Sequence, residues 1–109
     1  MRVLFVIGCN FYEHAGQLEG AERDAQRIFD ALIRPDVGEY DVIRSRLLLS
    51  PSYDAVRQAL KDVLFADPQP QTFTLFFAGH GSVSAGAFYM WLKDSSPNGL
   101  SVSAIAGRA

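Results

Sequence analysis

The sequence has a single cysteine, Cys9, and therefore cannot form an internal disulfide. A reducing, cytoplasmic compartment is the expected location. No stretch approaches the roughly 20 consecutive apolar residues of a membrane-spanning helix, so no membrane partner is expected. The formal net charge is only -2, and basic residues neither cluster nor alternate with aromatic ones. Nucleic acid is therefore not an expected partner either.

Candidate metal ligands and phosphate-binding motifs are also scarce. Of the two histidines, His14 follows Glu13 in a polar segment without metal-ligand spacing, and we expect both side chains at the surface. No cofactor or metal site is evident. The first strand-helix junction has neither G-x-G-x-x-G nor a Walker lysine, which argues against a nucleotide-binding α/β domain.

The chain has the size and composition of one globular domain. It has 109 residues, which are too few for two domains. Of these residues 49% are apolar and 20% are charged, as in a globular protein. Two runs of apolar, β-favouring residues, Arg2–Gly8 and Thr72–Ala78, have the composition of strands buried on both faces of a parallel sheet. A third strand is predicted over residues 40–49.

Two amphipathic helices are predicted between these strands. Apolar residues recur at the 3.6-residue period over residues 21–33, and this helix ends before Pro35. The second helix has Ser50 as its predicted N-cap and Pro51 at its first position, and it stops by residues 67–68. Strands that alternate with helices at this spacing predict an α/β fold, with a mainly parallel sheet and helices on both faces.

The pattern changes after the strand Thr72–Ala78. Residues 82–87 are small and are predicted to form a loop, residues 87–93 are an aromatic, strand-like run, and residues 94–99 are a turn. Residues 100–106 are predicted to be the first turns of a third helix. Because the sequence stops within that element, we expect it to be the amino-terminal portion of a larger domain.

A histidine directly follows one of the buried strands, in the run Gly79-His80-Gly81. The carboxyl edge of an α/β sheet is where ligands and catalytic groups collect, so His80 is a candidate catalytic residue. Gly81 has an N-H that can point at a developing negative charge. The alternative is a strand that ends in a polar turn with a structural histidine. Ser82 and Ser84 lack the G-x-S-x-G setting of a nucleophile.

Three segments together resemble the start of the caspase-like cysteine peptidase domain, most closely that of metacaspases and their bacterial relatives. They are residues 3–10 (VLFVIGCN), 18–25 (LEGAERDA) and 76–81 (FFAGHG). The resemblance runs from Arg2 to about Ile105 and keeps the order and spacing of the elements. It implies a three-layer sandwich with a mainly parallel sheet, in which residues 1–109 are the amino-terminal part of a single domain.

The resemblance also implies a Cys-His dyad. In that family the histidine matching His80 activates a cysteine thiol on the next strand, and the amide matching Gly81 helps to bind the oxyanion. A thiol is mostly protonated at neutral pH, so it needs an imidazole to take its proton. Caspase signatures place the cysteine about 50 residues after the histidine, which is beyond Ala109. We therefore expect a fold truncated before the nucleophile strand, and an isolated chain without activity.

Substrate preference is the third implication. Asp24 matches an acidic residue that lines the specificity pocket of metacaspases, and a carboxylate in a partly dry pocket attracts Arg or Lys at P1. Ala78 stands where metacaspases have a serine of the same pocket. Leu18 stands where caspases that cut after Asp have an arginine. Alternatively, Asp24 is a first-turn carboxylate that only complements the helix dipole.

The expected partners are a protein or peptide substrate and the remainder of the caspase-like domain. Calcium is possible by the family resemblance, although this chain offers no site for it. Cys9 could pair with His80 if their strands are neighbours, but a buried, unreactive thiol is the favoured interpretation. The alternative function is a catalytically inactive caspase-like module that acts in assembly or recognition.

Overall fold

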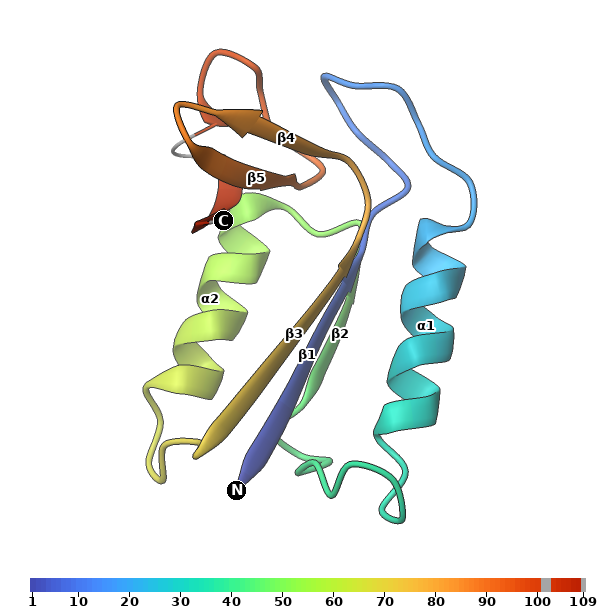
Figure 1. Cartoon of the computed structure of the whole chain (residues 1–109), viewed down its shortest axis with the longest axis vertical. Coiled ribbons are helices and arrows are strands. Elements are labelled where there is room, and N and C mark those ends of the chain that lie inside the picture. The colour runs from blue at the N-terminus through green and yellow to red at the C-terminus, as the bar shows by residue number, and fades with distance from the viewer. Residues whose placement is uncertain (101–102, 109) are drawn as a thin grey trace.

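The computed structural model describes residues 1–100 and 103–108, which form helices and two three-stranded sheets (Figure 1). None of the helices in this part of the chain has the length and apolar character needed to cross a membrane. In chain order the elements are β1 (Arg2–Gly8), α1 (Ala21–Leu32), β2 (Arg46–Leu49), α2 (Tyr53–Leu64), β3 (Thr72–Ala78), β4 (Gly81–Ser84), β5 (Ala87–Trp91) and β6 (Ala104–Arg108).

The predicted parallel sheet is confirmed, with the strand order β2-β1-β3. β1 pairs with β3 along its whole length, from Arg2 opposite Thr72 to Gly8 opposite Ala78. The side chains of residues 3–7 are fully buried, as the apolar composition of this strand predicts. β3 is less buried than its composition suggests, because it lies at an edge of this sheet and leaves Leu75 exposed.

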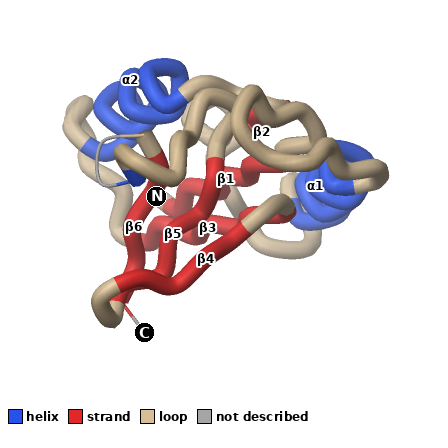
Figure 2. The backbone as a smooth tube through the Cα atoms, turned by 90° about the horizontal axis from the view of Figure 1, so that it is seen from above, coloured by secondary structure: helices blue, strands red, loops and turns tan. Residues whose placement is uncertain are grey.

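One face of β1 packs on α2 and the other on α1, since successive side chains of a strand point in opposite directions. Figure 2 shows the two helices on opposite sides of the parallel sheet. The cluster on the α2 side includes Val3, Phe5, Ile7, Val56 and Val63. The cluster on the α1 side includes Leu4, Val6 and Ala25.

The first helix lies within one residue of its predicted bounds. It begins after Gly20, whose φ of 94° is in the left-handed region that favours glycine. At Gly8, where β1 ends, an added Cβ would lie 2.5 Å from the Cβ of Ala25. A side chain at this glycine would therefore push α1 off the end of the strand.

The strand predicted over residues 40–49 is wrong in its first half. Only Arg46–Leu49 forms a strand, because Asp41 starts a turn: its carboxylate accepts the N-H of Arg44 at 2.8 Å. The guanidinium of Arg44 donates to the carbonyl of Val63 at 2.6 Å, at the end of α2. These polar contacts compete with strand pairing, and the β pattern alone does not reveal them.

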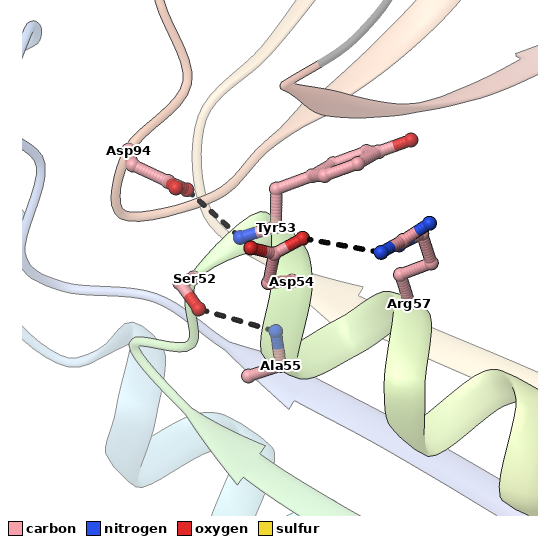
Figure 3. A network of polar contacts seen from close by, with 6 residues as sticks. All are labelled: Ser52, Tyr53, Asp54, Ala55, Arg57 and Asp94. Carbon is pink, nitrogen blue, oxygen red and sulfur yellow. Dashed lines mark hydrogen bonds and ion pairs between the residues drawn. The ribbon is translucent and has the colours of Figure 1, made fainter.

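The predicted N-cap of the second helix is also wrong. Ser52 rather than Ser50 caps α2, and its hydroxyl accepts the N-H of Ala55 at 3.1 Å (Figure 3). The carboxylate of Asp94 accepts the N-H of Tyr53 at 2.8 Å and thereby satisfies a second free amide of the first turn. Ser50 cannot serve as the cap because its hydroxyl binds the amides of residues 10 and 11 instead.

The segment after β3 forms a hairpin where a loop was predicted. β4 pairs antiparallel with β5, which confirms the aromatic run as a strand. Ala85 and Gly86 join them with φ values of 50° and 80°, which suit a tight turn between twisted strands. Figure 1 shows this hairpin above the carboxyl ends of the parallel strands.

The third helix, predicted over residues 100–106, is wrong where the structure describes it. Residues 104–106 belong to β6, which pairs antiparallel with β5, whereas residues 101–102 lie outside the described part. Ala104 is buried, and Ile105 packs against the cluster on the α2 side of β1. Long-range strand pairing thus overrides the helical pattern of a short segment.

Candidate active site

His80 and Cys9 lie at the same edge of the parallel sheet, since the strands that precede them are neighbours. Gly8 pairs with Ala78, and the N-H of Cys9 donates to the carbonyl of Ala78 at 2.9 Å. His80 follows two residues later, between β3 and β4. The condition under which Cys9 could pair with His80, that their strands are neighbours, is therefore met.

The imidazole of His80 is held by the loop that connects β1 to α1. Its Nε2 lies 2.7 Å from the carbonyl oxygen of Gly16, and its ring centroid lies 4.6 Å from that of Tyr12. A carbonyl oxygen can only accept a hydrogen bond, so Nε2 carries the proton. In the neutral imidazole Nδ1 then holds the free lone pair and is the ring nitrogen that can accept a proton.

The backbone of Gly81 presents its N-H away from the β4–β5 ladder. The N-H of Trp91 donates to the carbonyl of His80 at 3.0 Å, which makes these two residues a hydrogen-bonded position. Positions alternate along an antiparallel pair, so Gly81 and Met90 form the next, non-bonded position. A Cβ on Gly81 would lie 2.6 Å from Cζ of Phe88, so packing also favours glycine here.

Cys9 has the properties of a buried, unreactive thiol. Its side chain is fully buried, and Sγ donates to the carbonyl of Phe11 at 3.3 Å. Burial raises the pKa of the thiol, and hydrogen bonds with Tyr12 and Ser50 only partly offset this effect. A thiolate is the nucleophile in cysteine chemistry, and these surroundings disfavour it.

A polar cluster of Asn10, Glu22 and Ser50 ties the end of β1 to α1 and β2. The carboxylate of Glu22 accepts a hydrogen bond from the Ser50 hydroxyl at 2.6 Å. The N-H of Glu22 donates to the side-chain oxygen of Asn10 at 3.0 Å. The Ser50 oxygen accepts the N-H of Asn10 at 3.1 Å. The loop that holds His80 therefore begins from a fixed point.

The two predicted pocket residues lie near the same edge but differ in exposure. Asp24 is exposed on the first turn of α1, and the N-terminal end of that helix faces the carboxyl edge of the sheet (Figure 1). Ala78 is half-buried as the last residue of β3. Glu13 and His14 are exposed, as expected. The described residues include no group of three or more His, Cys, Asp or Glu that could hold a metal ion.

Sequence reasoning missed Tyr12, Gly16 and Gln17, all of which lie in the loop around His80. Tyr12 is buried and accepts the N-H of His80 at 2.8 Å. Gln17 bonds both backbone groups of Tyr12, at 2.7 and 2.6 Å.

A comparison with known families identifies the chain. The caspase domain model matches residues 1–99, which include both strands of the site edge, α1, α2 and the β4–β5 hairpin. No curated protein matches the chain. The α/β structure with its parallel sheet is compatible with a caspase-like fold. Because the match covers nearly the whole sequence, the chain belongs to the caspase domain family.

Proposed function

We propose that this chain supplies the general base of a cysteine endopeptidase that uses a Cys-His dyad. The caspase domain family is a family of cysteine peptidases, and His80 follows β3 at the carboxyl edge of the sheet. The observation that carries the proposal is the contact between Nε2 of His80 and the carbonyl of Gly16. It fixes the proton on Nε2 and keeps Nδ1 available to take a proton from a thiol.

The nucleophile comes from a part of the protein outside this sequence. Cys9 is the only cysteine of the chain, and its burial and raised pKa make it a poor nucleophile. β3 forms one edge of the parallel sheet of the described residues, so its outer backbone groups can pair with a further strand. A cysteine at the end of such a strand would lie beside His80. The completed domain is then a three-layer sandwich, and this chain alone is inactive.

The proposed chemistry needs only a proton transfer and a stabilised anion. His80 takes the proton of the thiol, and the thiolate attacks the carbonyl carbon of the scissile peptide bond. The N-H of Gly81 binds the resulting oxyanion. His80 then returns the proton to the leaving amine, and water hydrolyses the acyl-enzyme.

The proposed substrates are cytoplasmic proteins or peptides with Arg or Lys at P1, the preference expected of a metacaspase-like pocket. Asp24 supports this preference because it is exposed on the first turn of α1, and the N-terminal end of that helix faces the carboxyl edge of the sheet. An ionised carboxylate attracts a cationic P1 side chain and repels an acidic one.

A catalytically inactive module remains the second candidate. It is favoured by the contacts of His80, whose ring lies beside that of Tyr12 and whose Nε2 is hydrogen-bonded to a backbone carbonyl. The same packing would suit a structural histidine. In that case the site would serve recognition or assembly rather than hydrolysis.

Activity measurements on the longer protein that carries this sequence separate the two candidates. Peptide amides that end in Arg, Lys or Asp are the substrates, and His80→Ala is compared with His14→Ala. His14 is exposed in the neighbouring loop and serves as the matched control. We expect His80→Ala to remove nearly all turnover and His14→Ala to retain it. An inactive longer protein supports the module, and turnover by this chain that depends on Cys9 contradicts the proposed nucleophile.

A further inference from the structure

Tyr12 has no role in the catalytic chemistry proposed so far, although it contacts His80 directly. Tyr12 lies in the loop between β1 and α1 with a relative exposure of 4%. Its hydroxyl oxygen accepts the backbone N-H of His80 at 2.8 Å. Its ring also faces the imidazole, at a centroid distance of 4.6 Å and an interplanar angle of 53°. One side chain therefore contacts both the backbone and the ring of His80.

The chain leaves room for this contact at Gly79. A Cβ built on Gly79 would overlap the hydroxyl oxygen of Tyr12 and would lie 2.8 Å from Cζ of Phe77. The overlap with Tyr12 involves a hydroxyl that is itself bonded to His80, so it cannot move without loss of that bond. The glycine before His80 is therefore required by Tyr12, independently of any substrate.

The loop also fixes Tyr12 from its other side. The side-chain amide of Gln17 accepts the N-H of Tyr12 at 2.7 Å and donates to its carbonyl at 2.6 Å. Gln17 directly follows Gly16, whose carbonyl accepts the Nε2 proton of His80. Tyr12 and Gly16, which both contact His80, thus lie in one loop segment, and the side chain of Gln17 holds the two ends of that segment together.

We propose that Tyr12 is a positioning residue that holds His80 in the orientation in which Nε2 meets Gly16 and Nδ1 is free. The hydroxyl fixes the backbone of His80 and the ring limits rotation of the imidazole about its side-chain bonds. Both effects keep the proton on Nε2 and direct the Nε2-H at the carbonyl oxygen of Gly16. The catalytic consequence rests on the proposed function, whereas the positioning itself is a property of this chain.

The tautomer of His80 tests the positioning without any need for activity. The chain is labelled with ¹⁵N-histidine and examined by NMR at a pH where histidine is neutral. In the wild type we expect His80 to be almost entirely the Nε2-H tautomer, while exposed His14 supplies the reference ratio in the same sample. In Tyr12→Phe, which keeps the ring but releases the backbone N-H of His80, we expect the ratio at His80 to fall toward that of His14. In Tyr12→Leu the ratio should approach that of His14.

Gly79→Ala supplies a second, independent perturbation. The added methyl group should displace Tyr12 and lower the tautomer ratio in the wild-type background. In the Tyr12→Phe background the overlapping oxygen is absent, so the same substitution should change the ratio much less. Phe77 is present in both backgrounds, and its contribution cancels in this comparison. Circular dichroism confirms that each variant is folded.

Kinetics of the longer protein connect the positioning to catalysis. Tyr12→Phe should lower kcat and leave KM nearly unchanged, because Tyr12 orients a base and does not contact substrate. An unchanged His80 tautomer in both Tyr12→Phe and Tyr12→Leu overturns the proposal, even if His80→Ala abolishes activity. Conversely, if the Tyr12 variants shift the tautomer while the longer protein keeps its activity as His80→Ala, the positioning stands and the proposed function is overturned.

Discussion

The hydroxyl of Ser50 lies 2.6 Å from the carboxylate of Glu22, and this hydrogen bond joins the end of β2 to the first turn of α1. The Ser50 oxygen also accepts the N-H groups of Asn10 and Phe11, at 3.1 and 3.3 Å. Ser50, which follows β2, therefore binds both the start of the loop that carries Tyr12 and Gly16 and the first turn of α1. Stability and the geometry of His80 depend on the same cluster.

Ser50→Ala should lower the free energy of unfolding by about 1–3 kcal/mol, because it leaves partly buried amide and carboxylate groups without a partner. Urea unfolding followed by circular dichroism measures the change. Ser84→Ala is the control, since Ser84 is an exposed serine of β4. If the two substitutions have equal effects, the cluster does not stabilise the fold.

Stability should fall at alkaline pH. Burial raises the pKa of Cys9 above its ordinary value of 9.0 and that of Tyr12 above its ordinary value of 10.0. The unfolded chain then loses these protons at a lower pH than the folded chain does. The contribution is fully present below pH 9.0 and is lost as the pH rises through the raised values.

Urea unfolding at a pH below 9.0 and at a pH above 10.0 measures this loss. Tyr12→Phe removes one of the two titrating groups, so its stability should decline less between the same two pH values. A stability that is constant or rises over this interval would contradict the burial of both groups. The thiol of Cys9 should also react slowly with iodoacetamide until the chain is unfolded.

Asp24 should determine the P1 preference of the longer protein. A library of peptide amides that varies only at P1 should be cleaved after Arg and Lys, and Asp24→Asn should weaken that preference. Asp30, which is exposed farther along α1, provides the control substitution Asp30→Asn. A preference for Asp at P1, or an Arg/Lys preference that Asp24→Asn leaves unchanged, would assign Asp24 to the helix dipole alone.

The sequence predicted those parts of the fold that depend on local periodicity. β1, β3, α1 and most of α2 have clear apolar patterns, and each lies close to its predicted bounds. The placement of His80 at the carboxyl edge followed from the abrupt end of an apolar strand at Gly79. Its proximity to Cys9 required only that the two strands be neighbours.

The errors occur where contacts between distant segments decide the structure. The turn at Asp41 competes with a strand, and Arg44 of this turn reaches the end of α2. β6 forms because β5 offers an edge for it, although residues 100–106 have a helix-like pattern on their own. The contacts of Tyr12 and Gly16 with His80 join a loop to a strand end far along the chain, and no local pattern encodes them.

Chemical rescue of His80→Ala in the longer protein tests the central claim most directly. Removal of the imidazole should abolish turnover of a peptide amide, and free imidazole in the buffer should restore part of kcat, because it can take the thiol proton in the vacated space. Imidazole should leave the wild type unchanged. If His80→Ala instead retains a rate within a few-fold of the wild type and does not respond to imidazole, His80 is not the general base.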